Sequence, residues 1–388
     1  MGKMGELIGR GGRQMKKKGI QWLAILLAAL LLPAGAMGES DAALVQVTRV
    51  ECDGAVVGRC ALPAEYTVSS QVSYCGAGQS LSHPIQLEIS GISPAGDRLF
   101  AYASPAAYVQ YLDYTMNGAQ LLTHQDGQWD VNTMTTMLTF STAAGYADRV
   151  MTGKYPGVKI TVADEAEITP EAQAQVDAHT RQMYDQMTEL VAGDGTVSVD
   201  DAFFDVAQRS YEMQIDGVDY RAVVTTAVEA YQMTQNMAGD GLQVHISYIS
   251  WDVPFVYLML TPAAEYEAAM GEYELFVLNT SASDGFTNAC MQLSNQIRES
   301  VINSRSLAAG ETACRSGVQG LTESEYDYTQ ERFSDYLFSQ DDYTAADGRH
   351  VKVPNRYDYV YGDEMGNIYA TDNALDVPQG MTQLERNH

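Results

Sequence analysis

Alternating apolar and polar positions mark much of the first hundred residues as strands. The alternation is clearest in Val45–Val50, Tyr66–Tyr74 and Ile85–Ile89, and a turn at Ser93–Asp97 precedes a further run at Arg98–Ala103. Together these segments predict a small antiparallel sheet.

A second β region occupies the middle of the chain. Phe203–Ile215 and Tyr220–Tyr231 flank the turn dipeptide Asp216-Gly217, which predicts a hairpin. Leu242–Trp251 and Pro254–Thr261 predict a further pair of strands.

Helical patterns lie between and after these strands. Thr169-Pro170-Glu171 combines a threonine N-cap with proline in the first turn and predicts a helix that stops at Gly193. Thr261-Pro262-Ala263 repeats this pattern and predicts a helix to about Leu278. Three further helices are expected at Ala143–Met151, Gly285–Arg305 and Thr322–Phe338.

The last part of the chain, Asp341–Asn373, reads as a β-meander rich in tyrosine. Such a density of rings is typical of half-buried side chains on a small sheet, and an exposed row that stacks on carbohydrate is the alternative. We therefore expect an α+β fold: an antiparallel β-sheet core with packed helices, a helical C-terminal section and a terminal β-hairpin. The eight tyrosines that follow Thr322 are residues 326, 328, 336, 343, 357, 359, 361 and 369.

The first 38 residues have the layout of a bacterial signal peptide. Lys16, Lys17 and Lys18 precede an apolar run from Ile20 to Leu32, which is too short to cross a membrane comfortably but long enough for a signal peptide core. We expect cleavage after Ala36 or Gly38, with residues 1–14 as an upstream extension, although a retained N-terminal anchor is the alternative. The expected domains are then residues 39–281, an antiparallel-sheet domain, and residues 282–388, a helical pair with the tyrosine-rich meander.

The expected secreted chain is strongly acidic. Removal of residues 1–38 takes away six of 23 basic and one of 50 acidic residues, which leaves a formal net charge of −32. A field of this sign repels nucleic acid and anionic lipid, so nucleic-acid binding is excluded and no membrane span is expected after cleavage. The acidity favours solubility outside the cell, and a cell-wall glycan or a protein stays open as the partner.

Five cysteines lie in the part that would be exported, where disulfides are the usual state. Cys52 and Cys60 bracket a hairpin signal and could meet across two strands, whereas Cys290 and Cys314 lie on two neighbouring helical stretches. Cys75 is then the odd residue, either free or a substitute for one partner of the first pair.

One segment resembles the second half of a calcium-binding loop. In Gly193–Phe203 the residues Asp194, Ser198 and Asp201 fall on ligand positions, but Leu190 and Ala192 occupy positions that require oxygen ligands. A helix-to-strand turn is therefore the favoured interpretation, and no cofactor is expected beyond this calcium candidate. Three further acids, Asp341, Asp342 and Asp347, are more typical of a solvated turn.

No catalytic motif identifies an enzyme. The histidines at 83, 124, 179, 245 and 350 are scattered, and neither a zinc-hydrolase pair nor a nucleophile elbow is present. A glycosidase needs only two carboxylates a few Å apart. With 49 acidic residues in the expected secreted chain, this requirement does not distinguish an enzyme from other proteins.

The run Phe255–Ser281, FVYLMLTPAAEYEAAMGEYELFVLNTS, resembles the end of exported proteins with a PsbP or MOG1-like fold. The resemblance spans residues 45–281 and implies an antiparallel sheet that ends in a helix, in folds that serve mostly as binding or assembly modules.

We expect a secreted, non-enzymatic binding or envelope-associated module. The alternative is a secreted hydrolase of polysaccharide or peptide, and a pocket with two carboxylates, or with a Ser or Cys beside a His, would favour it.

Overall fold

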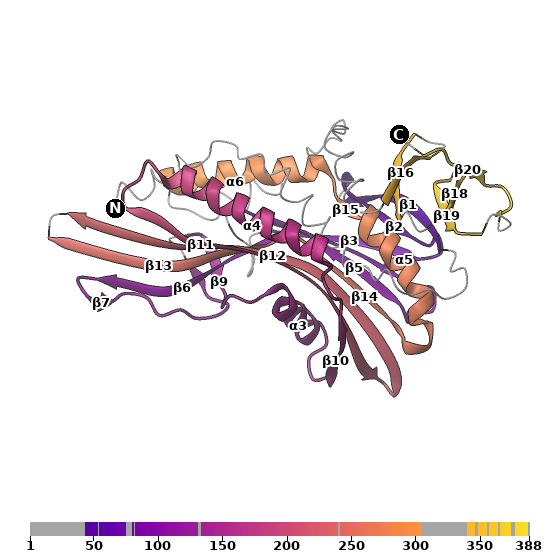
Figure 1. Cartoon of the computed structure of the whole chain (residues 1–388), viewed down its shortest axis with the longest axis horizontal. Coiled ribbons are helices and arrows are strands. Elements are labelled where there is room, and N and C mark those ends of the chain that lie inside the picture. Colours follow the sequence, from indigo (N-terminus) through magenta and orange to yellow (C-terminus); the bar gives the residue numbers. More distant parts are fainter. Residues whose placement is uncertain are drawn as a thin grey trace.

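The structure, a computed structural model, contains four helices and three β-sheets in the part that it describes (Figure 1). The strands pair antiparallel, with one parallel pair in the larger sheet. It describes residues 43–304 and 340–386, apart from residues 53, 75–79, 81, 131–132, 240, 346–347, 355–356, 364 and 374–376. The helices are α3 (Ala143–Lys154), α4 (Pro170–Val191), α5 (Tyr266–Asn279) and α6 (Asp284–Ser304). The expected signal peptide, Cys75, Cys314 and the expected helix Thr322–Phe338 lie outside the described residues.

Two long strands form the centre of the larger sheet. β11 (Val197–Ile215) and β12 (Val218–Gly239) are paired from Ile215↔Val218 to Val197↔Gln235, so the predicted hairpin is confirmed and is longer than expected. Its turn residues Asp216 and Gly217 have φ values of 51° and 82°, which is the left-handed geometry that a two-residue hairpin turn requires.

The next two strands lie end to end along β12. Both expected strands are present, and each pairs with β12: β13 (Leu242–Val253) with residues 229–239 and β14 (Val256–Pro262) with residues 220–226. Only Pro254-Phe255 separates them, and proline cannot adopt the positive φ that a two-residue hairpin turn requires at its first position, so the chain continues in the same direction.

A second pair of strands repeats this interruption beside the first. β5 (Leu99–Ala103) pairs with β14, β6 (Ala106–Met116) pairs with β13, and Ser104-Pro105 separates the two. The breaks in neighbouring strands therefore line up across the sheet, whose strands curve along their length (Figure 1).

Shorter strands complete the larger sheet. β3 and β4 extend it beyond β5, β10 pairs with β11, and β9 runs parallel to β6. Their bounds are β3 (Thr67–Tyr74), β4 (Ile85–Ile92), β7 (Ala119–Gln120), β8 (Trp129–Asp130), β9 (Thr135–Met137) and β10 (Ile160–Glu165).

The second sheet joins the two ends of the described chain. Its order is β15-β2-β1-β19-β18-β20, and strands from both sides of the expected 281/282 boundary share it. The bounds are β1 (Ala43–Cys52), β2 (Ala55–Leu62), β15 (Ser281–Ala282), β18 (Tyr359–Gly362), β19 (Asn367–Thr371) and β20 (Thr382–Gln383), with β16 (Gln340–Thr344) and β17 (His350–Pro354) as a separate two-stranded sheet.

The tyrosines of the terminal strands contribute mainly to packing. Tyr343 and Tyr357 belong to the core that packs the second sheet against β16 and β17, and Tyr361 is also buried, whereas Tyr359 and Tyr369 are half-buried. The three buried rings are not exposed to stack on a carbohydrate.

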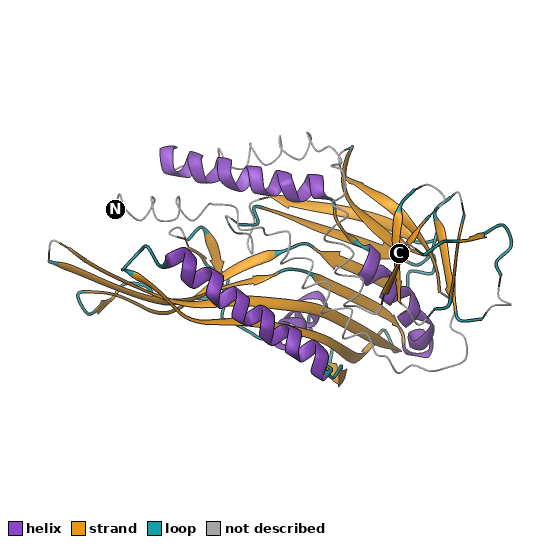
Figure 2. Ribbon diagram, turned by 45° about the horizontal axis from the view of Figure 1, so that its top comes forward, coloured by secondary structure: helices purple, strands orange, loops and turns teal. Residues whose placement is uncertain are grey.

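The helices cover both faces of the larger sheet. Figures 1 and 2 place α4 and α6 on one face and α3 on the other. α4 begins as predicted, because the Thr169 hydroxyl accepts a hydrogen bond from the amide of Ala172 and Pro170 is the first helical residue. No helix in the described part of the chain is long and apolar enough to span a membrane.

The matching signal at Thr261 does not cap a helix. Thr261 is buried within β14 opposite Arg221, and a short 3-10 turn, η1 (Ala263–Glu265), precedes α5. Pairing with β12 therefore places Thr261 in a strand, although the local sequence pattern predicts that it caps a helix.

The expected Cys52–Cys60 disulfide is wrong. β1 and β2 do form a hairpin, but its register places Cys60 opposite Thr48 and Cys52 opposite Ala55. The two cysteines are therefore offset by four positions along β1, which is farther than a disulfide can span. No disulfide joins any two of Cys52, Cys60 and Cys290, and the proposed partner of Cys290 lies outside the described residues.

Candidate functional site

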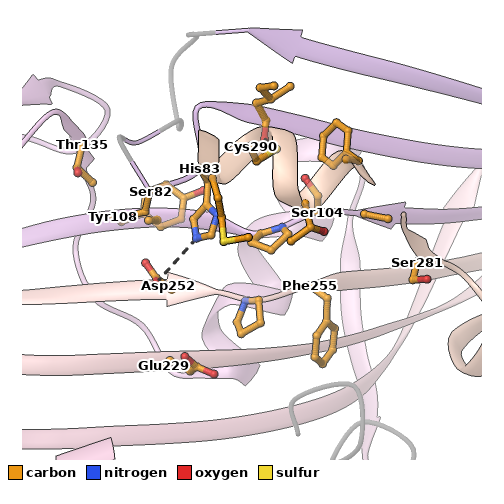
Figure 3. A pocket seen from close by; sticks show the side chains of 18 of the residues that line it. Ser82, His83, Ser104, Tyr108, Thr135, Glu229, Asp252, Phe255, Ser281 and Cys290 are labelled. Carbon is orange, nitrogen blue, oxygen red and sulfur yellow. Dashed lines mark hydrogen bonds and ion pairs between the residues drawn. The ribbon is translucent and has the colours of Figure 1, made fainter. Parts of the chain in front are cut away.

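A cavity of about 300 Å³ lies between the larger sheet and helices α4 and α6 (Figure 3). Strands β12 and β13 and the aligned breaks at Pro105 and Pro254 form its floor, whereas Met187 of α4 and Phe286 of α6 contribute from above. The polar and titratable side chains in the lining include His83, Glu229, Tyr231, Ser250, Asp252, Asp284 and Cys290.

Two cross-strand pairs from β12 and β13 line the floor. Glu229 lies directly opposite Asp252 and Tyr231 directly opposite Ser250, so alternation places all four side chains on the same face of the sheet. Glu229 is only 7% exposed, whereas the Asp252 side chain is 39% exposed. Two carboxylates therefore meet at this floor, one deep and one near the opening.

His83 approaches the outer carboxylate from the segment before β4. Its Nε2 lies 4.0 Å from Oδ2 of Asp252, and its backbone amide donates to the carbonyl of Ser80 (Figure 3). This places an imidazole beside Asp252 at the edge of the cavity.

His179 approaches the inner carboxylate from α4. It is the polar member of the buried stripe Ala172, Val176, His179 and Met183, and its ring meets Phe204 edge-on with centroids 4.6 Å apart. Its Nε2 makes no hydrogen bond and lies 3.9 Å from Oε1 of Glu229. Each floor carboxylate therefore has a histidine within 4.0 Å.

The floor carries a negative field. The pKa of Tyr231 is raised above its ordinary value, first because the phenol is buried and then because Glu229 and Asp252 disfavour a phenolate beside them. Tyr231 therefore stays a neutral hydroxyl that can donate a hydrogen bond.

The thiol in the cavity wall is not an activated nucleophile. Burial raises the pKa of Cys290 to about 12, and its sulfur lies 4.0 Å from the carbonyl oxygen of Ile85. The reactive form of cysteine is the thiolate, so Cys290 acts here as a small apolar side chain.

The calcium candidate does not form a site. Asp194 accepts hydrogen bonds from the amide and hydroxyl of Thr196, and these bonds lower its pKa. Ser198 donates to Asp200, and Asp201 accepts from the amide of Ala202. Each of the three side chains therefore makes a hydrogen bond with a close neighbour in the sequence, and Asp194 forms an Asx turn.

No metal site emerges elsewhere in the described residues. There, no three His, Cys, Asp or Glu side chains are grouped closely enough to hold a metal ion. Asp341 and Asp342 lie on β16, and Asp347 lies outside the described residues.

Sequence reasoning missed the cavity residues because His83, Glu229 and Asp252 come from segments far apart in the chain. One signal was present: Glu229 is the only charged residue in the run Ala222–Gly239, where an acid in an otherwise uncharged strand is unusual.

Comparisons with known proteins found no match among family models, curated proteins or solved structures. The resemblance to the PsbP or MOG1-like fold therefore stays a prediction.

Proposed function

We propose that this chain is an exported binding protein that holds a small organic molecule between the larger sheet and helices α4 and α6. The cavity carries this proposal. Apolar surface makes up the larger share of its walls, and polar side chains such as Glu229, Tyr231 and Asp252 supply groups that can orient a ligand, as in other small-molecule sites.

The lining supports binding of an organic molecule over binding of a sugar chain. Among the described residues that line the cavity there is no Trp to stack on a sugar ring, and no Asn, Gln, Arg or Lys to donate hydrogen bonds to sugar oxygens. Tyr102, Phe255 and Phe286 instead supply ring surface for an apolar body.

Secretion is the second part of the proposal. The signal-peptide layout of residues 1–38 supports it, as does the formal net charge of −32 that remains without them. Mass spectrometry of the protein from culture medium should give a mature N-terminus at Met37 or Glu39. An intracellular protein that retains residues 15–38 would contradict export.

Binding can be tested with 1-aminoanthracene, a small neutral dye whose fluorescence rises in apolar sites. We expect saturable binding to the wild-type chain and a loss of at least about tenfold in Ser250→Trp, because the indole would fill the cavity floor. Ser69→Trp is the matched control, since Ser69 is an exposed strand serine outside the cavity. Equal binding by all three proteins, or no saturable binding, would contradict the proposal.

A hydrolase is the second candidate, and one observation favours it: Glu229 and Asp252 face each other across two strands in a pocket. Two carboxylates are the minimum for acid-base cleavage of a glycosidic bond. Against a Ser or Cys mechanism, Cys290 has a raised pKa and no described hydroxyl is hydrogen-bonded to the His83 ring.

Turnover of a panel of chromogenic glycosides and peptide esters tests this candidate. The hydrolase predicts that Glu229→Gln and Asp252→Asn each reduce turnover at least about a hundredfold while the dye still binds. Absence of turnover, or turnover that both variants retain, would leave binding as the function.

A further inference from the structure

We infer that the molecule held in this cavity is an organic cation, an amine or quaternary ammonium on a compact apolar body. This inference rests on the proposed binding function and adds the charge of the ligand.

The charges of the lining residues point to a cation. The described residues around the cavity include three carboxylates, Glu229, Asp252 and Asp284, and neither lysine nor arginine. His83 is the one titratable base among them, and it faces Asp252. The three carboxylates outnumber the nearby histidines His83 and His179, so the formal charge around the cavity is negative.

The depth of the charge adds to this preference. Glu229 is 7% exposed and lies on the floor, so a ligand that reaches it has left most of its water behind. In such a site an opposite charge is attracted more strongly than at the surface, and a second negative charge is excluded more strongly.

The position of Glu229 opposite Asp252 supports the same conclusion. Like charges directly opposite on neighbouring strands destabilise a sheet, and a bound cation between them would relieve the repulsion. An anionic ligand would instead place a third negative charge beside this pair.

The rings around the cavity suit an ammonium group. Tyr102, Tyr231, Phe255 and Phe286 contribute to its lining. Aromatic faces attract cations, most strongly where water is excluded, and their apolar surface accepts the body of the ligand.

A matched set of three probes tests the charge class directly. Displacement of bound 1-aminoanthracene is measured at pH 8 with 2-phenylethylamine, 2-phenylethanol and 3-phenylpropanoate, which share a ring and a two-carbon arm and differ in charge. We expect the ammonium to displace the dye at a concentration at least about tenfold lower than the alcohol, and the carboxylate to be weakest. Added sodium chloride should reduce the preference for the ammonium.

Three charge variants locate the preference. Glu229→Gln and Asp252→Asn should each reduce the advantage of the ammonium over the alcohol about tenfold, with little change in the affinity for the alcohol. Asp185→Asn removes the same charge from an exposed position of α4 outside the cavity and should leave the advantage unchanged. Since Glu229 is buried, Asp252→Asn keeps the test valid if Glu229→Gln fails to fold.

The possible failures can be distinguished. If the dye binds saturably and Ser250→Trp abolishes its binding, but the alcohol or the carboxylate competes as well as the ammonium, the charge inference is wrong and the binding function stands. If no saturable, Ser250-dependent binding is found, the binding function itself is wrong.

Discussion

The two faces of the larger sheet are occupied in opposite ways by the same strands. On the α3 face, Trp251 is 1% exposed and its ring packs against Tyr108, Phe140 and Tyr146 at centroid distances of 4.7–5.9 Å. On the α4 and α6 face, the flanking residues Ser250 and Asp252 line a cavity.

β12 repeats the contrast, since Val228 and Ala230 are buried in the α3-side core while Glu229 and Tyr231 line the cavity. The difference teaches that alternate side chains of one strand can serve two purposes, core packing on one face of the sheet and ligand contact on the other. One set of positions maximises packing, and the other carries polar groups at a cost in stability.

The largest expected effect is on the filled face. Trp251→Ala should destabilise the fold by about 3–5 kcal/mol, because it leaves a large void and removes the hydrogen bond from Nε1 to the carbonyl of Leu138. Denaturant unfolding measures the loss. Ser250→Ala, one residue away on the cavity face, should change stability by less than about 1 kcal/mol. Equal losses from both variants would remove the contrast between the faces.

The next effect concerns Glu272 of α5, a half-buried acid that lies beside Arg98 and Tyr66. Burial, against the opposing attraction of Arg98, raises the pKa of Glu272 from 4.5 to about 7. The folded state therefore favours the protonated acid. The stability that this gives is present below pH 4.5 and is lost as the pH rises through about 7.

Glu272→Gln should then stabilise the chain at pH 8, by up to about 3 kcal/mol, and change little at pH 4.5. Melting curves of both proteins across this range measure the difference. A stabilisation that is independent of pH would show that the charge of Glu272 is not its cause.

A smaller gain is expected at the cavity floor. Asp252→Asn should raise the free energy of unfolding by less than about 1 kcal/mol, because it ends the repulsion across the pair with Glu229. The same variant is expected to lose cation preference, so stability and binding should move in opposite directions. A marked loss of stability would assign Asp252 a structural role through His83.

The smallest effect is expected from metal removal. Because Asp194, Ser198 and Asp201 are engaged with their own neighbours, EDTA should leave the melting temperature unchanged within about 1 °C, and calcium should not raise it. A clear drop with EDTA that calcium reverses would restore the calcium interpretation.

The predictable parts of this fold are those that local chemistry decides. Asp216-Gly217 has to turn and Thr169-Pro170 can cap a helix, and both were assigned correctly. The same dipeptide at Thr261-Pro262 belongs to a strand, because its neighbour β12 offers a ladder that a local pattern does not reveal.

The candidate site belongs to the parts that tertiary structure decides. His83, Glu229 and Asp252 are not separated by any regular interval in the sequence. They come together because β12 pairs with β13 and because the segment before β4 reaches Asp252. The offset between Cys52 and Cys60 has a similar origin, since the register of the hairpin, rather than the presence of its turn, decides which residues face each other.

The pairing of β1 with β19 has a consequence for the order of folding. Ala43–Gln46 finds its partner in Asn367–Ala370, so this edge of β1 stays open until nearly all of the chain has been synthesised. Contacts between residues so far apart in the sequence form slowly, because closing the long loop between them costs conformational entropy before the strand pairing can stabilise it. A polypeptide built this way can complete its second sheet only after residues 367–370 have left the ribosome, so β1 has to wait for a partner from the far end of the described chain.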